Sequence, residues 1–174
     1  MARRFTLDRR PPRLLPADYH EGFDMRFLCD AMLGRLAHWL RLLGYDAVYS
    51  AADDHELARQ ARAEDRVLLT RDTLLAERRG IRALLITSGS PDDQLRQVIQ
   101  EFGLSQTRAL SRCPKCNTLL REIQKPAVKD RVPPYVYEHH TAFQECPGCG
   151  RIYWQGSHWR RIQDRLAALN SNNE

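Results

Sequence analysis

Met25-Arg26-Phe27-Leu28-Cys29-Asp30 is an apolar run of strand length that ends in an acid, and it predicts a buried β-strand. The residues after it, up to Leu43, repeat apolar side chains at helical spacing and predict an amphipathic helix. Gly44 is a favourable residue for ending that helix. The apolar face of the helix consists of Met32, Leu36, Trp39, Leu40 and Leu43.

The same succession of strand and helix continues through residue 103. Three further apolar segments have strand character, and each is followed by a segment with helical spacing and a capping residue or glycine. Strands that alternate with helices favour a parallel sheet flanked by helices, so the sequence predicts an α/β fold for this region. The expected strands cover 47–50, 66–70 and 81–86, and the expected helices cover 53–63, 73–79 and 90–102.

Four of the five cysteines form two Cys-Pro-x-Cys pairs, Cys113 with Cys116 and Cys146 with Cys149. Two thiolates three residues apart on a tight turn can bind one tetrahedral Zn²⁺, and a second such turn completes a closed four-cysteine site. We therefore predict a small zinc ribbon with four cysteine ligands, in preference to disulfides or redox chemistry, and no histidine ligand. The fifth cysteine, Cys29, is expected to be a small buried side chain.

These signals divide the chain into three parts. Residues 1–24 are charged and rich in proline and predict an extended lead-in without a secretory or membrane-spanning segment. Residues 25–108 are expected to form the α/β domain, and residues 109–174 the zinc ribbon with an amphipathic C-terminal helix. Cytoplasmic residence is the expected location, because cysteines used as zinc thiolates suit a reducing compartment.

The net charge of +5 comes mostly from the cysteine-bearing end. Residues 111–174 hold 10 basic and 6 acidic side chains, whereas residues 25–110 hold 12 of each. A mildly basic zinc module suits a polyanion such as nucleic acid, although a charged face that serves solubility explains the balance equally well.

Acidic residues follow each predicted strand, and ligands of parallel α/β sheets bind at the carboxyl ends of the strands. Asp30 and Asp72 each end an apolar strand, where a charge is otherwise unfavourable. Carboxylates gathered at one edge repel each other, and Mg²⁺ or Mn²⁺ is the natural ion to neutralise them. Such an ion can activate water and stabilise charge on a phosphodiester, which predicts hydrolysis with Asp30 and Asp72 as metal ligands.

Further candidates for this site are open to a second interpretation. Asp54, Glu56 and Asp93 are candidate catalytic acids, but they also lie where acids are favoured in the first turn of a helix. The arginines Arg35, Arg41 and Arg71 are candidates for binding substrate phosphates. Tyr153, Trp154 and Trp159 have rings that could stack on bases, and packing against the zinc module is the plainer expectation.

Six segments of the chain share motifs with one known family: 28–46, 68–72, 113–117, 132–134, 146–149 and 153–159. On these segments the sequence resembles the Mut-seven C-terminal RNase domain family, a branch of the PIN-like nucleases. The resemblance implies a PIN-like α/β fold with a fused zinc ribbon, ribonuclease activity that depends on a divalent metal, and acidic positions that match Asp30 and Asp72. Some members carry an additional ubiquitin-like domain, which the short lead-in predicts to be absent or truncated here.

We therefore expect a metal-dependent endoribonuclease that uses Mg²⁺ or Mn²⁺ at the acidic edge and a structural zinc in the ribbon, with RNA as its partner. The alternative is a non-catalytic RNA-binding or adaptor module, in which the acids are helix caps and the ribbon binds RNA. Neither interpretation specifies the RNA, the cleavage position or the oligomeric state.

Overall fold

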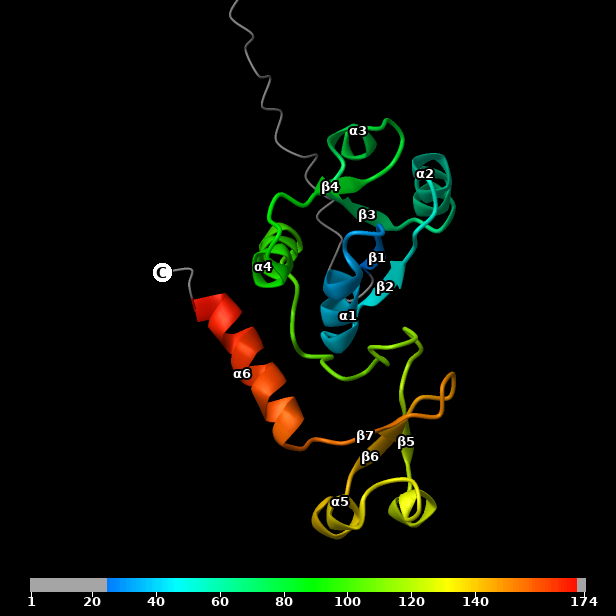
Figure 1. The fold of residues 1–174 in the computed structure, drawn as a ribbon, viewed down its shortest axis with the longest axis vertical. Coiled ribbons are helices and arrows are strands. Elements are labelled where there is room, and N and C mark those ends of the chain that lie inside the picture. Colours follow the sequence, from blue (N-terminus) through cyan, green and yellow to red (C-terminus); the bar gives the residue numbers. More distant parts are fainter. Residues whose placement is uncertain (1–24, 172–174) are drawn as a thin grey trace, which may run out of the picture.

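The computed structural model describes residues 25–171, so the predicted lead-in over 1–24 lies outside the described residues. Its first part is a parallel sheet with the strand order β2-β1-β3-β4 (Figure 1). Each strand is followed by a helix, as the sequence predicts. The strands are β1 Arg26–Cys29, β2 Asp46–Tyr49, β3 Val67–Thr70 and β4 Ala83–Leu85; the helices are α1 Gly34–Leu42, α2 Asp54–Ala63, α3 Thr73–Ala76 and α4 Pro91–Phe102.

Helices cover both faces of this sheet because side chains alternate along each strand. Phe27 and Cys29 of β1 face a large core that α1 and α4 close, while Leu28 faces a smaller core closed by α2 and α3. All three side chains are fully buried. The chain therefore forms a three-layer α/β structure, and the predicted fold class is confirmed.

The strand order determines which loops meet. The chain moves from β1 outward to β2 and then crosses back to β3, so β1 and β3 are neighbours at the centre of the sheet. The connections after these two strands leave in opposite directions, which is the point where ligands bind in open α/β sheets. Asp30 follows β1 and Asp72 follows the Thr70 that ends β3, so the two acids lie at this point.

The second part is an antiparallel sheet in the order β5-β6-β7, which lies below the C-terminal end of α1 in Figure 1. The strands β5 Arg121–Ile123, β6 Phe143–Glu145 and β7 Ile152–Tyr153 carry the cysteine loops at one end. Two short helical segments were not predicted: a 3-10 turn over Lys125–Val128 and α5 Pro134–His139, each with proline in its first turn. Proline has the backbone angle of a first helical turn and lacks the N–H that would remain unpaired there.

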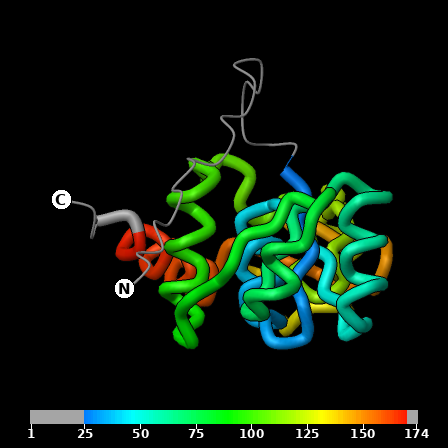
Figure 2. Tube along the Cα trace, turned by 90° about the horizontal axis from the view of Figure 1, so that it is seen from above, coloured from blue at the N-terminus to red at the C-terminus, as the bar shows by residue number. Residues whose placement is uncertain are grey.

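Helix α6, Ser157–Ser171, returns to the α/β part and runs beside α4 (Figures 1 and 2). Its residues Trp159, Ile162, Leu166 and Leu169 are buried in the same core as α1 and β1. The helix that follows the ribbon in sequence thus completes the core of the first part. The predicted division at residue 108 stays a prediction.

Candidate functional site

Asp30 is the first candidate catalytic residue, and its carboxylate lies at the carboxyl end of β1, 6% exposed. Its Oδ1 accepts a hydrogen bond from the backbone N–H of Met32 at 2.9 Å. Its Oδ2 accepts one from the Thr70 hydroxyl at 2.6 Å and one from the backbone N–H of Arg71 at 3.2 Å. A buried charge needs such partners, and together they fix the orientation of the carboxylate.

Asp72 is held beside Asp30 by the same hydroxyl. The Thr70 Oγ1 that donates to Asp30 also accepts the backbone N–H of Asp72 at 3.0 Å. The Asp72 side chain is exposed, and its Oδ1 caps α3 by accepting the N–H of Leu75 at 2.9 Å. The two acids therefore lie at one edge of the sheet, linked through Thr70. The sequence did not indicate the role of Thr70, because a threonine that ends a strand is common.

A pair of carboxylates at this edge has the oxygen ligands that Mg²⁺ binds together with water and phosphate. Among residues 25–171, no group of three or more carboxylates lies close enough to share one ion; the four cysteines are the group that meets this criterion. The other predicted acids are not part of such a cluster in the described structure.

Asp54 and Glu56 lie in the first turn of α2, which Asp53 caps by accepting the N–H of Glu56 at 2.9 Å. Glu56 pairs with Arg59 on the next turn, at 2.7 and 2.5 Å. Hydrogen bonding with Arg59 lowers the pKa of Glu56. The side chain of Asp54 is exposed. Both acids fit the capping pattern of a helix N-terminus, and their catalytic role stays a prediction.

Asp93 lies in the first turn of α4, after the edge strand β4. Its carboxylate accepts a hydrogen bond from the Ser88 hydroxyl at 3.2 Å and pairs with Arg96 at 2.5 Å. These are the contacts of an acid that stabilises a helix N-terminus. Its catalytic role also remains a prediction.

The three predicted phosphate-binding arginines lie at two different edges of the sheet. Arg35, in the first turn of α1, and Arg71, after β3, are exposed at the edge that carries Asp30. Arg41 is in the last turn of α1. Because α1 follows β1 and runs back antiparallel to the strands, Arg41 lies at the edge opposite the one that carries Asp30. Its guanidinium donates to the carbonyls of Ala47, Pro114 and Lys115 at 2.7, 3.3 and 3.0 Å.

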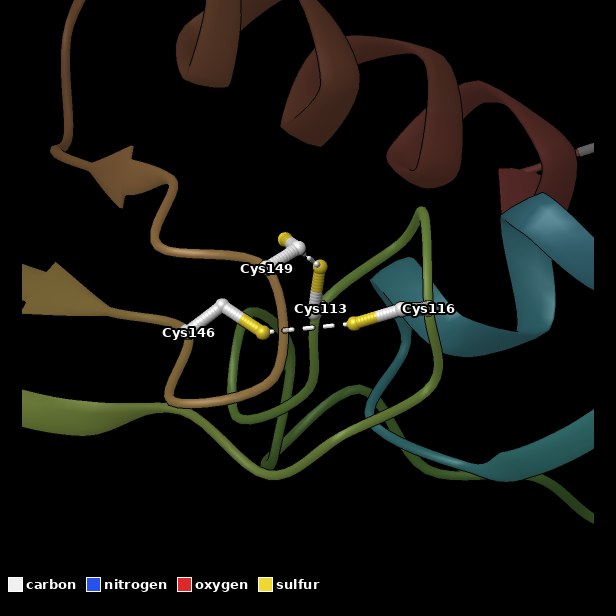
Figure 3. Close-up of side chains that lie close together, drawn as sticks. All are labelled: Cys113, Cys116, Cys146 and Cys149. Atoms are coloured by element: carbon white, nitrogen blue, oxygen red, sulfur yellow. Dashed lines mark hydrogen bonds between the residues drawn. The ribbon is translucent and has the colours of Figure 1, made fainter.

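The four predicted zinc ligands converge on one point (Figure 3). Their sulfur atoms all lie within 4.8 Å of one another; Cys116 and Cys146 are 3.3 Å apart and Cys113 and Cys149 are 3.7 Å apart. Zn–S bonds of about 2.3 Å in a tetrahedron place the sulfurs about 3.8 Å apart. The cluster therefore has the donor set and the size for a closed zinc site, without a histidine in the group.

Both cysteine turns have the same backbone design. The N–H of Asn117 bonds to the carbonyl of Cys113 at 2.9 Å, and the N–H of Gly150 bonds to that of Cys146 at 2.8 Å. Asn117 and Gly150, each directly after the second cysteine of its pair, have positive φ angles of 67° and 71°. Glycine and asparagine tolerate this conformation best, so the residue type after each pair is part of the turn.

The surroundings shift the pKa values of the cysteine thiols in opposite directions. Hydrogen bonding with Thr118 lowers the pKa of Cys116 to about 6, whereas burial raises the pKa of Cys146 to about 12. The Tyr153 hydroxyl lies 3.1 Å from the sulfur of Cys113. Bound zinc favours the thiolate form of every ligand, including the buried one.

The first cysteine turn is fastened to the amino-terminal edge of the parallel sheet. Asn117 accepts the N–H of Ala47 at 3.1 Å and donates to Asp46 at 2.7 Å. Asp46 also pairs with Arg66, which is 8% exposed, at 2.8 Å. Together with Arg41, these contacts place the zinc site at the edge opposite Asp30 and Asp72. Sequence reasoning missed this interface, because its partners are about 70 residues apart.

The aromatic residues near the second pair have different roles. Trp159 is buried in the core beside α1, not in the zinc ribbon where packing was expected. Trp154 packs against the small core of the ribbon around Val128 and Phe143. Both rings contribute to packing, in two separate cores.

The comparisons with known proteins give one match. The model of a protein family described as the Mut7-C RNAse domain matches residues 25–166. No curated protein and no solved structure matches the chain. No helix within residues 25–171 has the length and apolar character needed to cross a membrane.

Proposed function

The chain belongs to the Mut7-C RNAse domain family, and from this premise we propose that it is a metal-dependent endoribonuclease whose active site is formed by Asp30 and Asp72. The family implies RNA as the ligand. The single observation that carries the proposal is the Thr70 hydroxyl at the centre of the sheet, which donates to the carboxylate of Asp30 and accepts the backbone N–H of Asp72.

In this proposal, Asp30 and Asp72 hold Mg²⁺ or Mn²⁺. When bound, such an ion supplies charge stabilisation for the phosphodiester and a water of lowered pKa. Asp30 is preorganised by its three hydrogen bonds, so it does not reorient when substrate arrives. The exposed guanidinium groups of Arg35 and Arg71 are in position to bind phosphates beside the acids.

The remaining candidate acids have supporting roles in the proposal. Asp54, Glu56 and Asp93 lie in the first turns of α2 and α4, and in this proposal they add negative charge to the carboxyl end of the sheet. The four-cysteine site binds zinc and holds the ribbon rigid. Cysteines used as zinc thiolates suit a reducing compartment; the cytoplasmic location stays a prediction.

A non-catalytic RNA-binding module is the second candidate. It is favoured by one group of contacts: Asp72 caps α3, and Glu56 and Asp93 each pair with an arginine of their own helix. In this alternative the acids stabilise helix N-termini and metal is irrelevant to binding.

The test is cleavage of labelled total RNA with and without Mn²⁺ by the wild type and by Asp72→Asn. Asparagine caps helices as well as aspartate, so its amide oxygen keeps the bond to Leu75 while one metal ligand is lost. We expect cleavage by the wild type alone, and a Mn²⁺-dependent rise in melting temperature that the variant lacks.

Two further variants sharpen the test. Asp30→Asn is expected to abolish cleavage too. It also replaces one acceptor oxygen with an NH₂ group among three hydrogen-bond donors, which lowers stability by about 1–3 kcal/mol. Asp65→Asn is the matched control: Asp65 is exposed with a φ of 50°, which asparagine tolerates, and it should cleave normally. Full cleavage by Asp72→Asn, or none by the wild type with Mn²⁺, would contradict the proposal.

A further inference from the structure

A groove of about 1040 Å³ lies between α1, α5 and the start of α6, next to β7. Five aromatic side chains line it: Trp39, Tyr135, Tyr153, Trp154 and Trp159. They come from the α/β part, from the ribbon and from α6, so the groove exists because α6 returns to the first core. It belongs to neither predicted domain alone.

The groove is basic as well as aromatic. None of its lining residues is acidic, and four of the five histidines in the described part of the chain line it. Arg160 and Arg161 are exposed there and form no ion pair with any residue in the 25–171 range. Arg165 pairs with Asp92 and lies 4.7 Å from the centre of the Trp39 ring.

A second hollow of about 530 Å³ continues the groove toward the first cysteine turn. The two share His38, Pro114, Ile152 and Tyr153. The second hollow also has no acidic lining residue, and it contributes Lys115, Arg151 and Arg131, the last of which pairs with Glu145 at 2.7 Å. The basic lining therefore continues past the end of the aromatic groove.

Tyr135 is the ring among these five that is fully available for contact with a ligand. Its side chain is 67% exposed and stacks on His139, with ring centres 4.0 Å apart and an angle of 24° between the planes. An exposed stacked pair on the rim of a groove gives little folding stability. It is, however, a suitable platform for another planar group.

We propose that this groove binds single-stranded RNA, with a base stacked on the exposed ring of Tyr135 and phosphates paired with Arg160 and Arg161. Aromatic rings combined with a positively charged path are the two elements of single-strand binding. A duplex hides the faces of its bases, so it cannot use the rings. The inference rests on the proposed function for the identity of the nucleic acid.

The same groove gives the RNA a route to the acidic edge. On α1, His38 and Trp39 come three and four residues after Arg35, so the three side chains lie along one side of that helix. Trp39 and His38 line the groove, and Arg35 lies in the first turn, just beyond Asp30. The helix is about 13 Å long, a distance that an extended strand of RNA spans.

The test measures binding of a fluorescein-labelled 12-nucleotide oligouridylate to the zinc-loaded full chain without Mn²⁺. Tyr135→Ala should weaken binding on the order of tenfold, whereas Tyr135→Phe, which keeps the ring, should bind as the wild type does. Arg160→Glu/Arg161→Glu should weaken binding at least as strongly and reduce its salt dependence. The matched charge control is Arg26→Glu/Arg79→Glu, two exposed arginines outside the groove, which should bind normally.

The outcomes separate this inference from the nuclease proposal. Groove-dependent binding without cleavage would retain this inference and remove the nuclease. If the wild type cleaves RNA and the groove variants bind it normally, the groove inference is wrong and the nuclease proposal is retained. Equal affinity for an RNA duplex, or displacement by a polyglutamate peptide at equal charge, would overturn the assignment to single-stranded RNA.

Discussion

Replacing Arg41 tests whether this side chain binds substrate, as the sequence predicted, or holds the zinc ribbon in place. Its guanidinium makes three hydrogen bonds to main-chain carbonyls, one in β2 and two in the first cysteine turn. We predict that Arg41→Ala destabilises the protein and loosens the zinc site. Arg41→Lys should recover little, because one ammonium group cannot reach carbonyls in both segments.

The magnitude follows from these contacts. Hydrogen bonds to charged groups contribute about 1.5–3 kcal/mol each when buried. Arg41 is half-buried, and its longest bond is 3.3 Å, so we expect a total loss of about 2–4 kcal/mol. With a urea slope near 2 kcal/mol/M, this lowers the unfolding midpoint by about 1–2 M.

The assay is urea unfolding of the zinc-loaded protein, together with the rate of zinc transfer to a coloured chelator. Arg62→Ala is the control, since Arg62 is exposed and donates a single bond to the carbonyl of Gly80; it should change stability by less than about 0.5 kcal/mol. If Arg41→Ala keeps wild-type stability and zinc release but binds RNA more weakly, the structural role is refuted and the phosphate-binding role is supported.

The shared core, the zinc ligands and Asp46 each give a further prediction. Leu166 is 1% exposed in the core beside α1, so Leu166→Ala should lower the free energy of unfolding by about 2–5 kcal/mol, and the variant should still unfold in one cooperative transition. Leu74 is 80% exposed, so Leu74→Ala should be nearly neutral. Separate unfolding transitions for the ribbon and the sheet would refute the shared core. Cys116→Ser should lose zinc, which contributes roughly 10–16 kcal/mol of apparent binding energy in small modules. Cys29→Ala should keep it. If elemental analysis finds one zinc bound per chain of Cys116→Ser, this prediction is wrong. Asp46 has a lowered pKa, because its hydrogen bonds and charge pairing outweigh burial. Its contribution is therefore fully present above the unfolded pKa and is lost as pH falls through the lower folded pKa, so the destabilisation by Asp46→Asn should be larger at pH 7 than at pH 3; an equal loss at both pH values would contradict this.

Much of the fold could be predicted from the sequence because the relevant signals are local. The alternation of apolar strands and amphipathic helices depends on residues within one turn or one pleat of each other, and it predicted each element between residues 25 and 103 to within about three residues. Helix α3 is shorter than predicted: it ends at Ala76, not at Arg79, and Leu75 is its one buried side chain. The cysteine turns were predicted for the same local reason.

The candidate site was predictable in part. A charged residue at the end of an apolar strand identifies Asp30 and Asp72 without any knowledge of the strand order. It does not reveal that Thr70 joins them, nor that Glu56 and Asp93 have arginine partners of their own. A helix N-terminus and a metal site favour the same acidic residues, so sequence cannot separate the two roles.

The sequence alone therefore determined the strands and helices of the α/β part, the two cysteine turns and the acids at the strand ends, since each depends on neighbours along the chain. Only the tertiary structure decided that β1 and β3 are adjacent, that Arg41 faces the zinc site, and that α6 completes the core beside α1. These contacts join residues separated by tens to more than a hundred positions. The apolar face of one segment can pack against several other segments, and the native fold is the combination in which all the apolar faces are packed at once.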